Sequence, residues 1–336
     1  MAWLRKLILR GDAFQQGRTA LALPVAVARK VADDEGGSLA ALIAHYGLLS
    51  LFPLILVLSA VLGFLLGGNA SLKAHVVSTV ARSFPALSGY VTSSMKGSGL
   101  ALGLGTVVAL WAGLGVTRAT ERAMNAIWDV PLAERPSMLR SRLRGLGMLA
   151  ILGCTFLAST GLASLQQKGG VPAAPVAALS VLGPLVLNFG LYLLAFQVLT
   201  NRHLRWRTLA PGAAAGSAGW TLLQSLGALY VRHELAHASQ LYGTLAAVIG
   251  LLAWLYLGAL LTVYCAELNV VLDHRLWPRS LGRRSRTDAD RRALSLLARR
   301  YERAAGEVVG VGFGEGAGET PSDGRLAAER YSSGPG

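Results

Sequence analysis

The chain has little charge and almost no cysteine for its length. Of its 336 residues 15% are charged, against about 25% in an average soluble domain. Its two cysteines, Cys154 and Cys265, both lie in apolar stretches, which excludes a disulfide framework and a paired-cysteine metal site. Residues Met1–Arg10 lack the long apolar core and small-residue cleavage site of a secretory signal. We therefore expect the first membrane helix to direct insertion.

Long apolar runs take the place of the missing charge. A bilayer-crossing helix needs about 20 apolar residues. The runs lack the alternation of barrel strands, and backbone in lipid must be paired internally, so helices are expected. The sequence predicts an all-α, polytopic membrane helix bundle of about six transmembrane helices, over Leu39–Leu66, Leu100–Arg122, Gly145–Leu165, Ala173–Thr200, Leu209–Val231 and Gly243–Leu272.

The net charge of +14 is placed between these runs and in the tails. A nucleic-acid-binding domain would gather its basic residues on one soluble surface, whereas these lie where anionic lipid headgroups attract them. Of the 32 Lys and Arg residues, 27 fall on one side of the predicted membrane and 5 on the other. The positive-inside rule then places both termini in the cytoplasm.

Three regions follow from this pattern. Residues 1–38 form a cytoplasmic segment with an interfacial helix over Leu21–Asp34, residues 39–272 form the transmembrane domain, and residues 273–336 form a basic tail. In the tail, Thr287 followed by Asp288 and Asp290 indicates a helix start, and the amphipathic helix would lie on anionic lipid. From Ala304 the Gly- and Ser-rich composition predicts disorder.

Proline interrupts several predicted membrane helices. Pro53 lies in the first, Pro184 in the fourth and Pro211 near the start of the fifth. Matching interruptions in two halves of inverted topology point to a transporter's binding site, although proline also simply bends membrane helices. We place a candidate polar cavity between the first, second, fourth and sixth helices, lined by Tyr46, Ser50, Pro53, Trp111, Asn125, Asn188 and Glu267.

Ionisable residues lie at the cytoplasmic ends of the second and sixth helices. Arg118 and Glu267 are both expected one to two turns from the membrane surface. Such residues rarely face lipid and usually find partners. The sequence therefore predicts an Arg118–Glu267 charge pair, which would act as an inner gate or relay, or as a structural link between helices.

The run His233-Glu234-Leu235-Ala236-His237 matches a zinc-binding pattern. On a helix, it puts two histidines on one face with a glutamate as general base. Here the run falls in a short predicted outside loop, and Glu267 is expected at the opposite membrane face, about 30 Å away. We expect no metal site, with His233 and His237 as the weak candidates.

Three blocks resemble one membrane-protein family, with Cys265 in place of its usual glycine. They are Tyr46-Gly-Leu-Leu-Ser50-Leu-Phe52-Pro53, Trp111-Ala-Gly113 with Met124-Asn125-Ala-Ile-Trp128, and Tyr242-Gly243 with Leu252-Ala-Trp254-Leu-Tyr256 and Cys265-Ala-Glu267-Leu-Asn269. In this order they are similar to the YihY/BrkB family. The resemblance implies a six-helix inner-membrane protein, linked to virulence in some bacteria and often assigned to transport.

Some members of that family carry a ribonuclease label, but no metal-binding carboxylate cluster or RNA-binding surface is visible in this sequence. We expect no enzyme, no cofactor and no nucleic-acid partner. The predicted function is a permease-like or lipid- and envelope-related membrane protein acting on an unidentified small solute or lipid, as a monomer or an oligomer. The alternatives are a membrane zinc metalloprotease and a non-transporting membrane scaffold.

Overall fold

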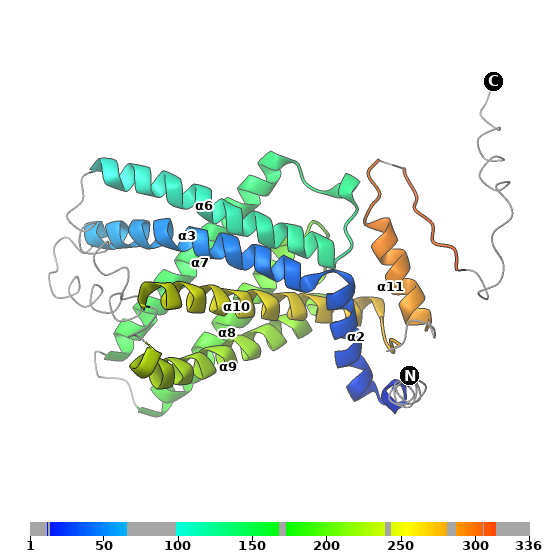
Figure 1. Ribbon diagram of the computed structural model, residues 1–336. Coiled ribbons are helices and arrows are strands. Elements are labelled where there is room, and N and C mark those ends of the chain that lie inside the picture. Colours follow the sequence, from blue (N-terminus) through cyan, green and yellow to red (C-terminus); the bar gives the residue numbers. More distant parts are fainter. Residues whose placement is uncertain are drawn as a thin grey trace, which may run out of the picture.

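The computed structural model describes residue 12 and residues 14–65, 99–167, 173–238, 243–280, 287–304 and 306–313. In this part of the chain every regular element is helical, which confirms the all-α class (Figure 1). The helices are α2 (Thr19–Asp33), α3 (Gly36–Leu65), α6 (Gly99–Ile127), the short 3-10 helix η2 (Leu132–Glu134), α7 (Met138–Gln167), α8 (Ala173–Leu199), α9 (Trp206–Ala238), α10 (Gly243–His274) and α11 (Asp288–Arg299).

Each predicted apolar run coincides with one of the long helices α3 and α6–α10. The helices α6, α7 and α9 extend several residues beyond the predicted runs, because hydropathy marks the limit of the bilayer and not the end of the backbone helix. Within the described residues, two stretches are long and apolar enough to cross a membrane by length and composition, Leu182–Leu199 and Val248–His274.

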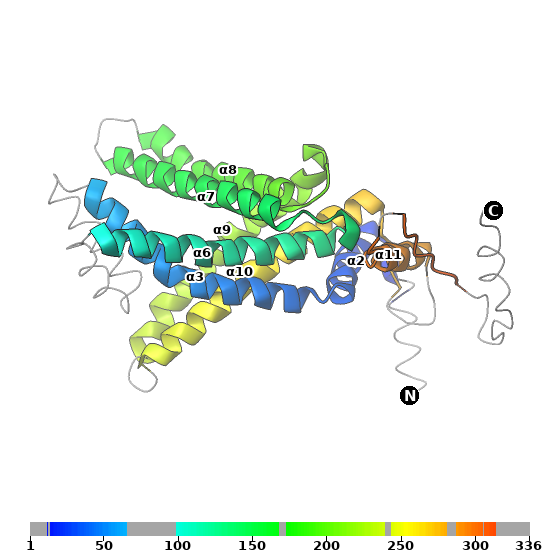
Figure 2. The ribbon, with the colours of Figure 1, turned by 90° about the horizontal axis from the view of Figure 1, so that it is seen from above.

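The six long helices lie side by side with α10 at the centre. The α10 helix contacts α2, α3, α6 and α9, while α8 packs on α9, and α7 packs on α6 and α8. Figures 1 and 2 show α2 crossing one end of this bundle and α11 lying beyond the same end. We call this the α2 end; here the segments from the two ends of the chain meet.

Glycines on α9 let the central helices approach closely. A Cβ at Gly212 would lie 2.2 Å from the Cys265 carbonyl oxygen of α10. The Gly212 amide donates to Asn269 Oδ1 at 2.7 Å, so the contact also pairs a buried side-chain amide. Further along α9, a Cβ at Gly216 would lie 2.9 Å from the Tyr192 ring of α8. Small residues thus serve helix packing here.

Burial is uneven along the bundle. At the α2 end Ile127, Trp128 and Leu276 are at most 1% exposed. Elsewhere, large apolar side chains lie on the outside of the bundle, among them Val107, Trp111, Val186, Leu222 and Ile249. Extensive exposed apolar surface marks a membrane or protein contact, and here it covers several helices.

The helix predicted over Leu21–Asp34 is present as α2, which starts two residues earlier than expected and contains Pro24. It ends at Asp33 with Asp34 as its C-cap, and Glu35, with φ of 54°, turns the chain into α3. Lys30 lies in the last turn of α2, where a cation is favoured by the helix dipole. The side chain of Lys30 points into the bundle and not to the surface.

Candidate functional site

The residues predicted to line a mid-membrane cavity do not all face one common cavity. Trp111 is 78% exposed, so its predicted role as a cavity wall is wrong. Ser50 is buried and donates to the Gly47 carbonyl of its own helix at 2.9 Å, which satisfies it locally. The Tyr46 ring packs against Gly115 of α6, although the residue remains 37% exposed.

The structure describes the side chains at one of the two predicted proline bends. Pro184 is exposed and Asn188 is half-buried on α8, while the side chain of Pro53 lies outside the described residues. The His233–His237 run forms part of helix α9 and not of a loop, contrary to the sequence prediction. Its side chains also lie outside the described residues, and no metal-binding group of His, Cys, Asp or Glu occurs among those that are described.

Two predicted residues, Asn125 and Glu267, are buried at the α2 end, with 2% and 0% exposure. Asn125 Oδ1 accepts a hydrogen bond of 2.8 Å from the Asn201 amide, so it fastens the end of α6 to the connection between α8 and α9. The predicted partner of Glu267 is wrong: among the described ion pairs its carboxylate meets Lys30, and none joins it to Arg118.

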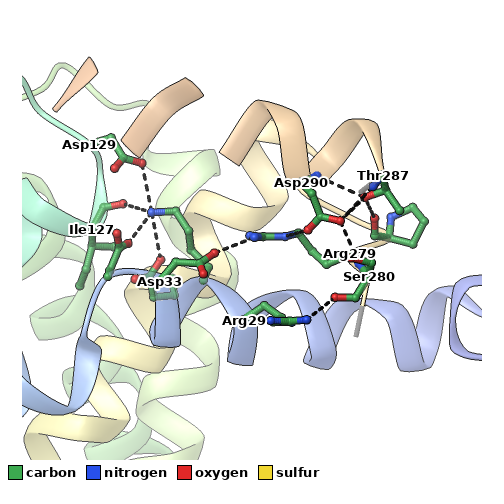
Figure 3. A network of polar contacts seen from close by, with 12 residues as sticks. Arg29, Asp33, Ile127, Asp129, Arg279, Ser280, Thr287 and Asp290 are labelled. Atoms are coloured by element: carbon green, nitrogen blue, oxygen red, sulfur yellow. Dashed lines mark hydrogen bonds and ion pairs between the residues drawn. The ribbon is translucent and has the colours of Figure 1, made fainter. Parts of the chain in front are cut away.

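Lys30 is the centre of a buried charge cluster. Its Nζ contacts the Asp34 carboxylate and lies 3.0 Å from Asp129 Oδ2 and 3.9 Å from Glu267 Oε2. It also donates to the Ile127 carbonyl at 3.3 Å. Figure 3 shows Asp129 and Ile127 directed at this ammonium group. We use "charge cluster" for Lys30, Asp34, Asp129 and Glu267, with Arg300 at its edge.

The cluster joins segments that are far apart in sequence. Lys30 and Asp34 come from the end of α2, Asp129 follows α6, and Glu267 lies on α10. Arg300, just after α11, reaches Asp34 Oδ1 at 3.4 Å. Three carboxyl groups therefore surround one buried ammonium group, and a second cation touches the cluster from its partly exposed edge.

Burial and charge act in opposite directions on these groups. Burial alone would lower the pKa of the Lys30 ammonium, but the carboxylates of Glu267, Asp34 and Asp129 outweigh it, and the pKa lies above its ordinary value. Burial raises the pKa of Asp129 to about 6, against the opposing effect of Lys30. Lys30 is thus charged at all physiological pH values, whereas Asp129 titrates close to neutrality.

A second network, the arginine clamp, holds the tail to α2. Arg279 is 4% exposed and pairs with Asp290 Oδ1 at 2.7 Å and Asp33 Oδ2 at 2.6 Å. Burial would raise the pKa of Asp290, but hydrogen bonds from Thr287, Arg279 and Ser280 lower it to about 2. Figure 3 shows the clamp beside the charge cluster, with Asp33 between Arg279 and the cluster.

The tail helix α11 begins at the predicted place. Thr287 caps it in a reciprocal capping box with Asp290. Beyond α11, the Leu132 amide donates to the Arg300 carbonyl at 3.3 Å and the Ala133 amide to Glu302 at 3.1 Å. The tail is therefore fastened to the loop after α6. Residues 306–313 are described without helix or strand, and the predicted disorder after them lies outside the described residues.

A basic pocket of about 320 Å³ opens beside α11, lined by His274, Arg291, Arg292, Ser295, Leu296 and Arg299. Arginine forks suit phosphate and carboxylate groups. Two of these arginines already have partners: Arg292 donates to the Arg275 carbonyl at 2.9 Å, and Arg299 lies 3.8 Å from Glu302.

Sequence reasoning missed Lys30, Asp34 and Asp129 as members of a site. A signal was present in α2, where Ala22, Ala26 and Lys30 recur at intervals of four and are each at most 1% exposed. A lysine on the small, buried face of a helix requires a buried counter-charge.

The chain was compared with known proteins. A family model described as "Virulence factor BrkB" matches residues 27–290. The putative ribonuclease-like protein YfkH of Bacillus subtilis is 27% identical over 72% of this chain and 91% of its own length. A UPF0761 membrane protein of Chromohalobacter salexigens is 34% identical, over 46% of this chain and 38% of its own length.

A UPF0761 membrane protein of Rhodospirillum rubrum is 27% identical over 89% of this chain and 69% of that protein. No solved structure matches the chain. The family model spans α3 and α6–α10. It also covers all four buried members of the charge cluster: Lys30, Asp34, Asp129 and Glu267. The chain therefore belongs to the BrkB family and is a membrane protein.

Proposed function

We propose that this chain is a multi-pass inner-membrane permease-like protein, acting on a small solute or lipid, whose charge cluster forms the cytoplasmic gate. The observation that carries the proposal is the meeting of Lys30, Asp129 and Glu267, buried and from three different segments, at one end of the bundle. A static helix bundle has no need of such a cluster, because apolar side chains of similar volume would serve packing at least as well.

The topology forms part of the proposal. The six helices α3 and α6–α10 would each cross the membrane, with both termini and the α2 end in the cytoplasm. The 27-to-5 division of Lys and Arg supports it. Reporter fusions after Gly170 and Gly336 test it; a cytoplasmic signal from the fusion at Gly170 would refute it.

The arrangement suits a gate for a physical reason. Closed, the ammonium of Lys30 satisfies carboxylates from α2, the segment after α6, and α10. Opened, the same groups would be hydrated, so the loss of ion pairs is offset by solvation. Two arrangements of similar free energy are what a gating element requires.

The proposal includes no enzymatic step. The word "ribonuclease" belongs to the name of YfkH. The charge cluster has the ammonium group of a lysine at its centre, where a two-metal nuclease would bind two metal ions. The basic pocket beside α11 would hold anionic lipid headgroups at the cytoplasmic surface, and so orient the clamp against the membrane.

The deciding experiment uses the full chain reconstituted in liposomes. A thermal-shift screen of solutes and lipids in detergent selects ligands, and flux of each is then measured with the wild type and with Glu267→Gln. The exposed Asp273→Asn on the same helix is the control. We expect ligand-dependent flux that Glu267→Gln reduces and Asp273→Asn leaves intact.

Two results would replace the proposal with its alternatives. A chain that no solute or lipid stabilises, and that conducts none, would be a membrane scaffold. Stoichiometric zinc in the purified protein, lost in His233→Ala, would indicate the metalloprotease instead.

A further inference from the structure

The charge cluster contains more acid than base. Asp34, Asp129 and Glu267 are 3%, 7% and 0% exposed, and the buried cation among them is Lys30. Arg300 contributes a second positive charge from the edge, where its side chain is 20% exposed. With all three carboxyl groups ionised, the set would still carry one uncompensated negative charge.

Within the described residues, no further cation forms an ion pair with these carboxyl groups. His274 of α10 packs edge-on against Trp128, with ring centroids 6.4 Å apart, and among the described ion pairs it meets Asp273. Arg135, from the segment after η2, lies near Arg300 and Arg122. The described ion pairs of Asp129 and Glu267 all go to Lys30.

The hydrogen bonding of Glu267 gives an independent indication. Both of its carboxyl oxygens are fully buried and, among the described residues, accept no hydrogen bond. The 3.9 Å to Lys30 Nζ is too long for one. Glu267 and Asp34 both lie against Lys30 Nζ, and a buried carboxyl group that no donor satisfies is more stable in its neutral, protonated form.

We infer that the closed charge cluster binds one proton, held chiefly on Glu267, and that opening of the gate releases it to cytoplasmic water. On release, the carboxyl O–H bond breaks, the proton passes to a water molecule, and the carboxylate that remains is hydrated. Closing takes one proton back. This coupling rests on the gate of the proposed function, but the proton site itself does not require transport.

A proton fits the cluster better than a metal ion does. The Lys30 ammonium occupies the position between the carboxylates, and no group of His, Cys, Asp or Glu in the described chain is arranged to hold a metal. Asp129, outside the membrane helices, has a pKa raised to about 6 by burial. Asp129 therefore holds a proton more firmly than an aspartate in water does.

Infrared spectroscopy of the full chain in lipid nanodiscs tests the proton directly. At neutral pH, the wild type should show the carbonyl stretch of a buried carboxylic acid, which shifts in D₂O. Glu267→Gln should lose the band, because two carboxylates then face two cations and no proton is needed. Asp273→Asn, an exposed change on the same helix, should keep it.

If Glu267→Gln does not fold, Asp129→Asn gives the same charge balance and should also lose the band. A wild type without a carboxylic acid band at neutral pH, or a band that survives both cluster variants, would overturn the inference. The band without any solute or lipid flux would leave the proton site standing and refute the permease. Flux without the band would support the permease and refute the proton site.

Discussion

Replacing Lys30 by methionine removes the central cation of the charge cluster while nearly preserving its volume. At an effective dielectric constant of about 20, the attractions to Asp129 at 3.0 Å and Glu267 at 3.9 Å amount to about 5.5 and 4 kcal/mol. Desolvation of the ions cancels much of this. Removing one partner of a buried set, however, leaves the others unpaired, which typically costs about 3–5 kcal/mol.

We therefore expect Lys30→Met to lower the free energy of unfolding by about 3–5 kcal/mol at neutral to mildly alkaline pH, below the unfolded pKa of lysine. Denaturant unfolding in detergent, followed by the fluorescence of tryptophans that include the buried Trp128, measures the change. The pKa of Lys30 is raised in the folded chain. Its stabilisation is therefore complete below the unfolded pKa and is lost only as the pH rises through the folded value.

The carboxyl groups make the loss depend on pH. In acid they take up protons and need no counter-ion, so Lys30→Met should cost less there. The double variant Lys30→Met/Glu267→Gln should recover about 0.5–3 kcal/mol of the loss, as for contacting residues in general. Arg140→Met, at an exposed position of α7, should change stability by no more than about 0.5 kcal/mol. A Lys30→Met protein as stable as the Arg140→Met control would refute the electrostatic reasoning.

Three further changes probe other parts of the molecule. Asp129 has a pKa of about 6, above its ordinary 3.8, so the free energy of unfolding should fall as the pH rises between these two values. In Asp129→Asn, denaturant unfolding should show a free energy that changes less with pH over this range. Gly212→Ala places a Cβ 2.2 Å from a carbonyl oxygen and should lower the free energy of unfolding by at least about 1–3 kcal/mol. The control Gly147→Ala, with no neighbour within 4 Å, should leave it unchanged in the same assay. Thr287→Ala should cost about 0.5–2 kcal/mol and speed hydrogen exchange in α11, while Ser295→Ala, which loses only a bond within the helix, should not.

The helical fold was accessible from the sequence because it follows from local pattern. Each apolar run became a long helix, and the cap at Thr287 started α11 at the predicted residue. The α2 helix was recognised within two residues at its start. These features depend on hydrophobic length and on hydrogen bonds between near neighbours, both of which can be read along the chain.

The charge cluster could be predicted only in part, because it depends on contacts between distant segments of the chain. Glu267 stood out as an acid in an apolar run. Lys30 did not, because a basic residue before the first membrane helix is what the positive-inside rule leads one to expect at the surface. Its burial depends on the contact of α2 with α10, which no local pattern encodes. Arg118 was the nearest candidate partner along the membrane helices, and it was the wrong one.

The clamp and the cluster also constrain how the protein is made. Arg279 bonds Asp33 across a sequence separation of 246, and Arg300 bonds Asp34 across 266. Lys30 therefore leaves the ribosome long before Glu267 and Arg300, and must remain hydrated at the membrane surface meanwhile. Its burial can be completed only when the last helices arrive. We therefore expect a chain truncated before Glu267 to leave Lys30 without one of its buried partners at the α2 end.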